Sequence, residues 1–230
     1  TLSDPDADWQ QLEQSLVLLG QLRERQWQNK CLPLLEHDRP EVLVTAAWLL
    51  HLMPQRDIAE QAGQTTLRRH KLYQETPSSG PQGVARALQL TFLFQHAGFT
   101  ELTSLQNLCA KQFSKGEGDP EKRAAGLWAL GKINKGNADP TIAGKLTERI
   151  FDDALLSPEF QVVRRMSVAA LVWMNARSAV KDMLKIRKKY GVRGMLGETA
   201  RWALPQLGAK QPPALKALNI PIGTFSISPL

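Results

Sequence analysis

The sequence predicts an all-α fold, specifically a right-handed α-solenoid of about five to six helical hairpins. Apolar residues recur at helical spacing along most of the 230 residues. A leucine that closes such a segment returns every 31 to 43 residues, a period typical of helical hairpin repeats. Stretches rich in Gly, Pro and Ser at 75–81 and 114–119 separate the segments as loops would. We expect the solenoid to cover 1–208 and an extended, proline-containing tail to cover 209–230.

The clearest helix is expected at 120–133. The side chain of Asp119 can accept hydrogen bonds from the first turn, and Pro120 stands where a missing N–H costs little. The apolar positions follow at three-residue spacing: Ala124, Leu127, Leu130 and Ile133. Ala125, Gly126 and Ala129 are small enough to let a neighbouring helix approach closely. Because one such helix cannot bury its own apolar face, copies of it must stack beside it.

Six copies are found by aligning the closing leucine of each segment. These leucines are Leu19, Leu50, Leu93, Leu130, Leu171 and Leu204. Second helices are expected at 101–113 and at 141–156, the latter with Leu155 facing inward. An Asp-Pro pair at Asp139 should open the second of these helices, and pairs at Asp4 and Ser157 should open the first repeat and the repeat after 156. The last copy, 195–207, shows no partner helix after it and is expected to end the stack as a lone helix.

These segments resemble the HEAT-repeat family, especially its phycobilin-lyase-type branch. The branch pattern Asp-Pro-x-x-Arg-x-x-Ala-x-x-Ala-Leu-Gly is followed by Asp119, Pro120, Arg123, Ala124, Leu130 and Gly131. Partial copies occur at 158–171 and 40–49, and a degenerate one at 84–96. The resemblance covers roughly 4–207. It implies a helical-repeat fold and does not specify a chemistry.

Charge is distributed unevenly along the chain. The formal charge is +7, yet 160–230 alone holds 12 Lys and Arg against 2 acidic residues. Within it, a basic helix is expected at 177–190, with Val180, Met183, Leu184 and Ile186 as its apolar set. The cations that could contact a partner or a polyanion are Arg164, Arg165, Arg177, Lys181, Lys185, Lys188, Lys189, Arg193 and Arg201.

Two interpretations of this basic helix remain open. Arg177, Lys181, Lys185 and either Lys188 or Lys189 recur at about four-residue steps, which places them along one side. Such a stripe can bind phosphates or an acidic protein surface. Alternatively, it is an ordinary solvated face whose last-turn cations complement the negative end of the helix.

No catalytic or metal-binding pattern stands out, and we expect no cofactor. Cys31 and His37 form the nearest approach to a ligand pair, and a zinc site would need two more partners. Asp152 and Asp153 are expected to lie on a solvated helix face beside Arg149. Trp48, Trp128 and Trp202 share one register and are expected in the core; Trp9, Trp27 and Trp173 lie off that register.

We therefore expect a non-catalytic protein–protein interaction or scaffold module that is a fragment of a larger protein. The alternative is a module that binds nucleic acid or another polyanion through its basic C-terminal third. A third option, weaker than both, is a HEAT-like DNA glycosylase or lyase, for which Asp182 would be the available aspartate in that third. No apolar run approaches the roughly 20 residues that a membrane-spanning helix needs.

Overall fold

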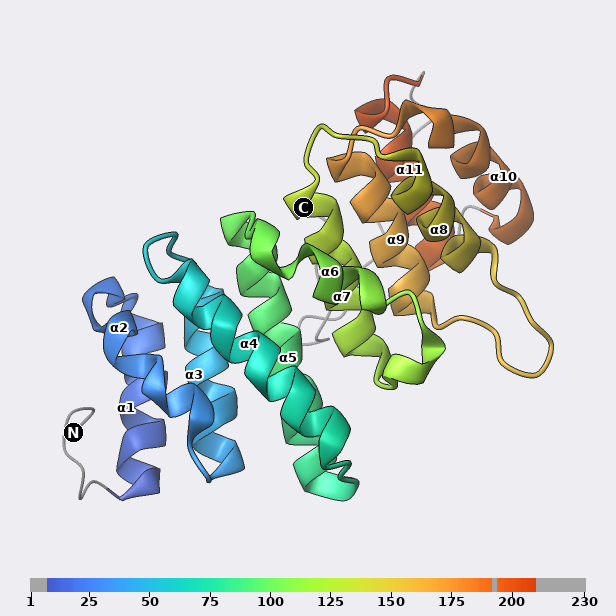
Figure 1. Cartoon of the computed structure of the whole chain (residues 1–230). Helices are drawn as coiled ribbons and strands as arrows, with labels where there is room; N and C mark the ends of the chain where they lie inside the picture. The colour runs from blue at the N-terminus through green and yellow to red at the C-terminus, as the bar shows by residue number, and fades with distance from the viewer. Residues whose placement is uncertain (1–7, 192–193, 210–230) are drawn as a thin grey trace. The chain divides into compact units, whose positions relative to one another are not determined.

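The computed structural model describes residues 8–191 and 194–209, and this part of the chain is all-helical. It contains eleven α-helices and short 3-10 segments, and no strand occurs in it. The predicted all-α class is confirmed. Asp4, Arg193 and the predicted tail beyond Ala209 lie outside the described residues. The chain divides into two compact units, unit 1 (residues 1–109) and unit 2 (residues 110–230), each described by itself below (Figure 1).

Unit 1 contains four long helices and several short, partly 3-10 segments. The long ones are α1 (Trp9–Leu22), α3 (Pro40–Leu52), α4 (Ala59–Glu75) and α5 (Gly80–Thr100). The short ones are α2 (Gln28–Cys31) and the 3-10 turns Arg25–Trp27, Pro33–Glu36 and Thr103–Leu105; α6 (Gln106–Lys111) spans the division between the units.

In unit 1, α3 lies between α1 and α5, and α4 packs on α5 (Figure 1). The buried core that joins these helices includes Leu16, Leu35, Leu49, Met53 and Leu93. Among the described helices, α3 is the main neighbour of α1, and α1 lies at an edge of this layer (Figure 1).

The helices of unit 2 are α7 (Pro120–Ile133), α8 (Pro140–Phe151), α9 (Gln161–Trp173), α10 (Val180–Tyr190) and α11 (Met195–Gln206). Helix α9 lies between α7 and α11, while α8 packs on α9 and α10 packs on α11. The backbones of α7 and α9 approach closely at Gly131, where an added Cβ would stand 2.3 Å from the Cα of Ala170. The small residues of this motif therefore allow the two helix backbones to touch.

The predicted helix 120–133 is confirmed at both ends. Asp119 accepts a hydrogen bond from the backbone N–H of Lys122 at 2.8 Å, and Pro120 is the first helical residue. Asp139 caps α8 in the same way, through the backbone N–H of Ile142 at 2.9 Å. These local signals predict where a helix begins because their partners lie within one turn.

Several predicted boundaries were wrong. The expected helix 101–113 is shorter, because Glu101 adopts a left-handed conformation (φ 56°) that ends α5. The expected helix 141–156 stops at Phe151. Ser157 does not cap the next helix, which begins at Gln161 without a side-chain cap. Helix α11 packs against α9 and α10, and the segment that would show whether a partner helix follows it lies outside the described residues.

Candidate functional site

Three arginines at equivalent positions of the aligned segments have a shared structural role. Arg86, Arg123 and Arg164 each stand seven residues before a closing leucine. Each donates to a carbonyl where the preceding helix ends or has just ended: Arg86 to Thr76, Arg123 to Gln112 at 3.2 Å, and Arg164 to Ile150 at 2.8 Å. These carbonyls have no partner within their own helix, so the arginine satisfies them.

Arg164 is therefore not available to a partner, contrary to the sequence-based expectation. Its side chain is only 4% exposed and forms an ion pair with Asp153. It also donates to the hydroxyl of Tyr190 at 2.8 Å. The periodicity of the basic residues does not reveal this, because it cannot distinguish an arginine that binds a carbonyl inside the fold from one in solvent.

Arg165 and Arg201 are also engaged within unit 2. Arg165 is half-buried and donates to the hydroxyl of Thr199 at 3.1 Å, and burial lowers the pKa of its guanidinium. Arg201 pairs with Glu198 of the preceding turn at 3.3 Å. The predicted cluster of cations from neighbouring repeats is thus reduced to those of α10 and the turn before it.

These remaining cations lie on an exposed surface. We call Arg177, Lys181, Lys185 and Lys188, with Leu184 among them, the α10 basic face; all five are exposed. Lys185 pairs with Asp182 at 2.9 Å, whereas Arg177, Lys181 and Lys188 make no ion pair with another described residue. Leu184 was expected on the apolar side, yet its side chain is half exposed while Met183 and Ile186 are fully buried.

Asp152 and Asp153 do not form a solvated helix face; they follow the end of α8 and hold a loop in place. Asp152 pairs with Lys115 at 2.8 Å and with Arg149 at 3.1 Å. Asp153 pairs with Arg164 and Lys189 and accepts from the Tyr190 hydroxyl at 2.7 Å. The hydrogen bond from Lys189, followed by that from Tyr190, holds the pKa of Asp153 well below its usual range, so its carboxylate is ionised.

The other end of this loop is held by Glu159, which is buried. Its two carboxylate oxygens accept from Arg123 at 2.8 and 2.6 Å, and Arg149 lies 3.5 Å away. Burial by itself would raise the pKa of Glu159, but the hydrogen bonds and charge of Arg123 lower it overall. The three acidic residues of 152–160 are therefore all ionised and paired.

The tip of the loop carries a fully exposed apolar pair, Leu155 and Leu156, which we call the loop tip. Phe160, where the loop meets α9, is 57% exposed. The expectation that Leu155 faces inward was wrong, because the helix ends four residues before it. Large apolar side chains held fully in solvent are uncommon enough to mark an interaction site when they occur together.

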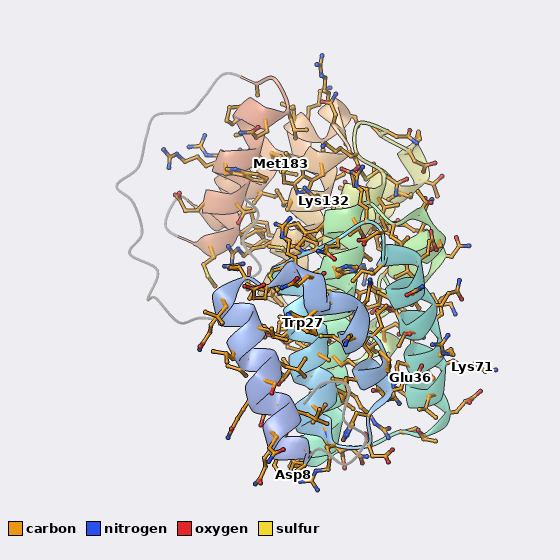
Figure 2. All side chains as sticks on the ribbon, turned by 90° about the vertical axis from the view of Figure 1, so that its left-hand side faces the viewer. Asp8, Trp27, Glu36, Lys71, Lys132 and Met183 are labelled. Atoms are coloured by element: carbon orange, nitrogen blue, oxygen red, sulfur yellow. The ribbon has the colours of Figure 1, made fainter. Side chains whose placement is uncertain are left out.

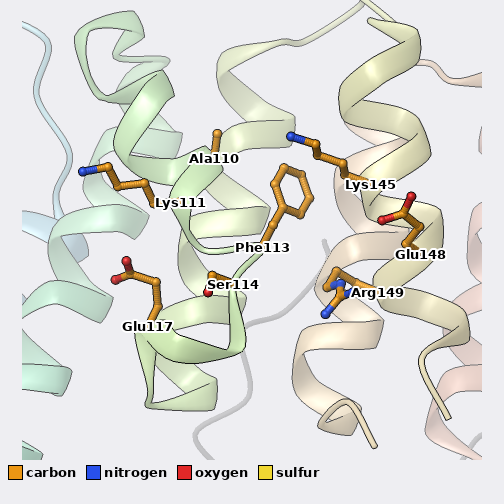
Figure 3. Close-up of a pocket in the computed structure, with 8 residues that line it drawn as sticks. All are labelled: Ala110, Lys111, Phe113, Ser114, Glu117, Lys145, Glu148 and Arg149. Atoms are coloured by element: carbon orange, nitrogen blue, oxygen red, sulfur yellow. The ribbon is translucent and has the colours of Figure 1, made fainter. Parts of the chain in front are cut away.

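A groove lies beside α8 in the same unit, with a volume of about 420 Å³. It is lined by Ala110, Lys111, Phe113, Ser114, Glu117, Lys145, Glu148 and Arg149 (Figure 3). Phe113 stands in its middle with the Lys145 ammonium 5.8 Å from the ring centre. Arg149 is already engaged by Asp152 and Glu159, and the remaining charges are of both signs. The groove therefore indicates no particular ligand.

Unit 1 presents a surface of a different character on α1. The exposed residues of this helix are Gln10, Gln11, Gln14, Leu18, Gln21 and Leu22, and none carries a charge. Leu18 and Leu22 are 54% and 60% exposed. We call this set the α1 outer face. The buried residues of α1 are Leu12, Leu16 and Gly20, so the α1 outer face lies on the side away from α3. Helix α1 itself lies at the edge of the layer (Figure 1).

The histidines and cysteines do not come together as ligands in the described part of the chain. Cys31 donates to the carbonyl of Trp27, while Nδ1 of His37 accepts from the backbone N–H of Arg39. Within 8–191 and 194–209, no group of three His, Cys, Asp or Glu side chains is placed to hold a metal ion. Asp182, the aspartate considered for a glycosylase, pairs with Lys185.

The tryptophans follow their predicted division only in part. Trp128 is buried, as expected, whereas Trp48 and Trp202 are half-buried. Of the other three, Trp27 is exposed, Trp9 lies under Arg39, and Trp173 lies 3.8 Å from the ammonium of Lys132. These aromatic contacts are cation–π pairs within the fold.

Among the described residues, none of the helices combines the length and hydrophobicity needed to span a bilayer. No family model matches the chain, and no curated protein is significantly similar to it.

Proposed function

We propose that this chain is a non-catalytic binding module, built from HEAT-like repeats in a right-handed solenoid, that docks a protein partner through the α1 outer face. The observation that carries this proposal is the absence of charge from every exposed position of α1. Centres of protein interfaces are depleted in charged residues and enriched in apolar ones. The partner should therefore present a neutral helix that packs on α1 as α3 does on the opposite side.

Site-specific photocrosslinking in the cells that produce the protein tests this proposal. Benzoylphenylalanine at Leu18 or Leu22 should give one discrete cross-linked product. The same probe at Lys71, which projects from α4 into solvent (Figure 2), serves as the control and should give none. No product at positions 18 and 22, or the same products at all three, would contradict a docking face on α1.

The second candidate function is polyanion binding through the α10 basic face. Arg177, Lys181 and Lys188 support it, because no acidic group of the described residues neutralises them. The test is fluorescence anisotropy with a generic DNA duplex at low and at physiological salt. Affinity should fall steeply with salt and be lost in a Lys181→Glu, Lys185→Glu double variant. A duplex that does not bind even at low salt would remove nucleic acid from consideration.

A further inference from the structure

Hydrogen bonds at the base of the loop between α8 and α9 fix the loop tip so that it projects from the rest of unit 2. The backbone N–H of Glu159 donates to the carbonyl of Asp152 at 2.9 Å, which brings the two ends of the loop together. The N–H of Ser157 donates to Ala154 at 3.2 Å, and Lys115 donates to the carbonyl of Ser157. Leu155 and Leu156 stand on this clamped base and are presented to solvent.

The loop tip and the α10 basic face belong to one edge of unit 2. Asp153, two residues before Leu155, binds the side chains of Lys189 and Tyr190 at the end of α10. The loop between α8 and α9 and the C-terminal end of α10 lie at the same edge of this unit (Figure 1). The loop that carries the loop tip is therefore attached to the C-terminal end of α10, the helix that carries the α10 basic face.

This edge combines exposed apolar side chains with positive charge. The acids of the loop are all paired within the fold, so they leave no free negative charge beside the leucines. On α10, Lys181, Lys185 and Lys188 surround the half-exposed Leu184 on one face. An arrangement of this kind lets apolar groups enter the acyl region of a bilayer while lysines bind the headgroups.

We infer that the loop tip and the α10 basic face together form a site for an anionic membrane surface, into which Leu155 and Leu156 insert. This inference rests on the polyanion-binding candidate for α10 and adds the class of polyanion. A nucleic-acid duplex would use the lysines and leave the two leucines in water. An anionic bilayer uses both sets of residues, which is why the combination favours lipid.

Sedimentation of the purified 230-residue chain with lipid vesicles tests the inference. Vesicles of phosphatidylcholine with phosphatidylserine should bind the protein, and vesicles of phosphatidylcholine alone should bind it much less. The double variant Leu155→Ser, Leu156→Ser should bind anionic vesicles about tenfold or more weakly, because two inserted side chains are lost. Lys181→Glu, Lys188→Glu should weaken it by at least about fivefold for each lysine.

Matched control variants lie in unit 1. The double variant Leu67→Ser, Val84→Ser replaces two exposed apolar side chains, and Arg25→Glu, Lys71→Glu makes the same change in net charge as the α10 variant. Both should bind vesicles as the parent chain does. A bimane label at Leu156→Cys should shift to shorter wavelength with anionic vesicles, since the two native cysteines are buried and react poorly.

The outcomes separate the inference from the polyanion candidate. In one outcome, the lysine variant loses vesicle binding while the leucine variant keeps it and the bimane label does not shift. This result would overturn membrane insertion and would leave polyanion binding as the function of α10. Binding to a DNA duplex and not to anionic vesicles would overturn it in favour of nucleic acid. No binding to either at low salt would overturn both.

Discussion

Arg123 and Glu159 form a two-pronged ion pair inside unit 2, although 36 residues separate them in the sequence. The side chains are 1% and 0% exposed, and Arg123 also donates to the carbonyl of Gln112. The pair thus connects the segment after α6, the start of α7 and the segment before α9. A buried pair of this kind is strongly disrupted when one partner alone is removed.

Replacing Glu159 by Gln should therefore lower the free energy of unfolding by about 3–5 kcal/mol, because Arg123 is left buried without a counter-charge. Urea denaturation followed by far-UV circular dichroism measures this. The double variant Arg123→Met, Glu159→Leu is the control and should regain much of the loss. A loss below about 1 kcal/mol in the single variant would mean that water reaches the pair.

Gly131→Ala should destabilise unit 2 by about 1–3 kcal/mol, because the new methyl group would overlap the backbone of Ala170 and force α7 from α9. Gly144→Ala on α8 is the matched control, since nothing lies within 4 Å of the added Cβ there. That variant should gain up to about 1 kcal/mol from helix propensity. Thermal denaturation of both variants provides the comparison; stabilisation by both would contradict the close contact.

Unit 1 should lose stability in mild acid because of His51 and His96. Burial lowers the pKa of His51 to about 4. The pKa of His96 is also lowered to about 4, mainly by burial and to a smaller extent by the nearby His51. The unfolded chain, with histidine pKa values near 6.5, therefore takes up protons first. Stability contributed by the neutral rings is complete above pH 6.5 and is lost between pH 6.5 and 4.

The loss should reach at most about 3 kcal/mol for each histidine. Amide hydrogen exchange in α3 and α5, followed from pH 7 to 4.5, measures it. A His51→Gln, His96→Gln variant should show a flatter dependence over this range. Equal slopes in the variant and the parent chain would assign the acid sensitivity to other groups.

The two cysteines should react slowly with a thiol reagent in the folded chain. Burial raises the pKa of both Cys31 and Cys109 to about 12. At pH 8 the thiolate fraction is then about a thousandfold smaller than for a free thiol. Release of thionitrobenzoate should be slow in buffer and rapid, with two equivalents per chain, in denaturing urea. Rapid reaction of either thiol in the folded state would contradict its burial.

Two cations from the same basic segment should differ sharply when neutralised. Arg164→Gln should lower the free energy of unfolding by about 2–4 kcal/mol, since Asp153 and the carbonyl of Ile150 lose their donor. Lys181→Gln, on the exposed face of α10, should change it by less than about 0.5 kcal/mol. Chemical denaturation of both measures the contrast, and equal effects would mean that Arg164 has no structural role.

Much of the helical architecture could be predicted because its determinants are local. Asp119 and Pro120 mark the start of α7 within a few residues of their partners. The ends of helices were harder to predict. Glu101 ends α5 in a left-handed backbone conformation that favours glycine. Asp152 follows the last residue of α8 and pairs with Lys115, which is distant in the sequence. Apolar residues recur beyond both points, at Leu102 and Leu105 and at Leu155 and Leu156, so hydrophobic periodicity does not mark either end.

The candidate site was predicted only in part, because it depends on which charges find partners. Asp153 lies next to Lys189 in the fold, 36 residues away in sequence, and no local pattern indicates that pairing. The exposed lysines of α10 were identified from spacing alone. The exposure of Leu155 and Leu156 follows from the end of α8, so an error of a few residues in that boundary concealed the loop tip.

The carbonyl bonds of Arg123 and Arg164 also bear on how unit 2 unfolds. Each arginine attaches its own helix to the end of the segment before it and to a segment that follows: Arg123 through Glu159, Arg164 through Tyr190. The neighbouring helices of unit 2 are therefore coupled by polar contacts as well as by apolar packing. Because strong coupling between neighbouring elements disfavours partly melted forms, we expect the helices of unit 2 to melt together as one cooperative unit.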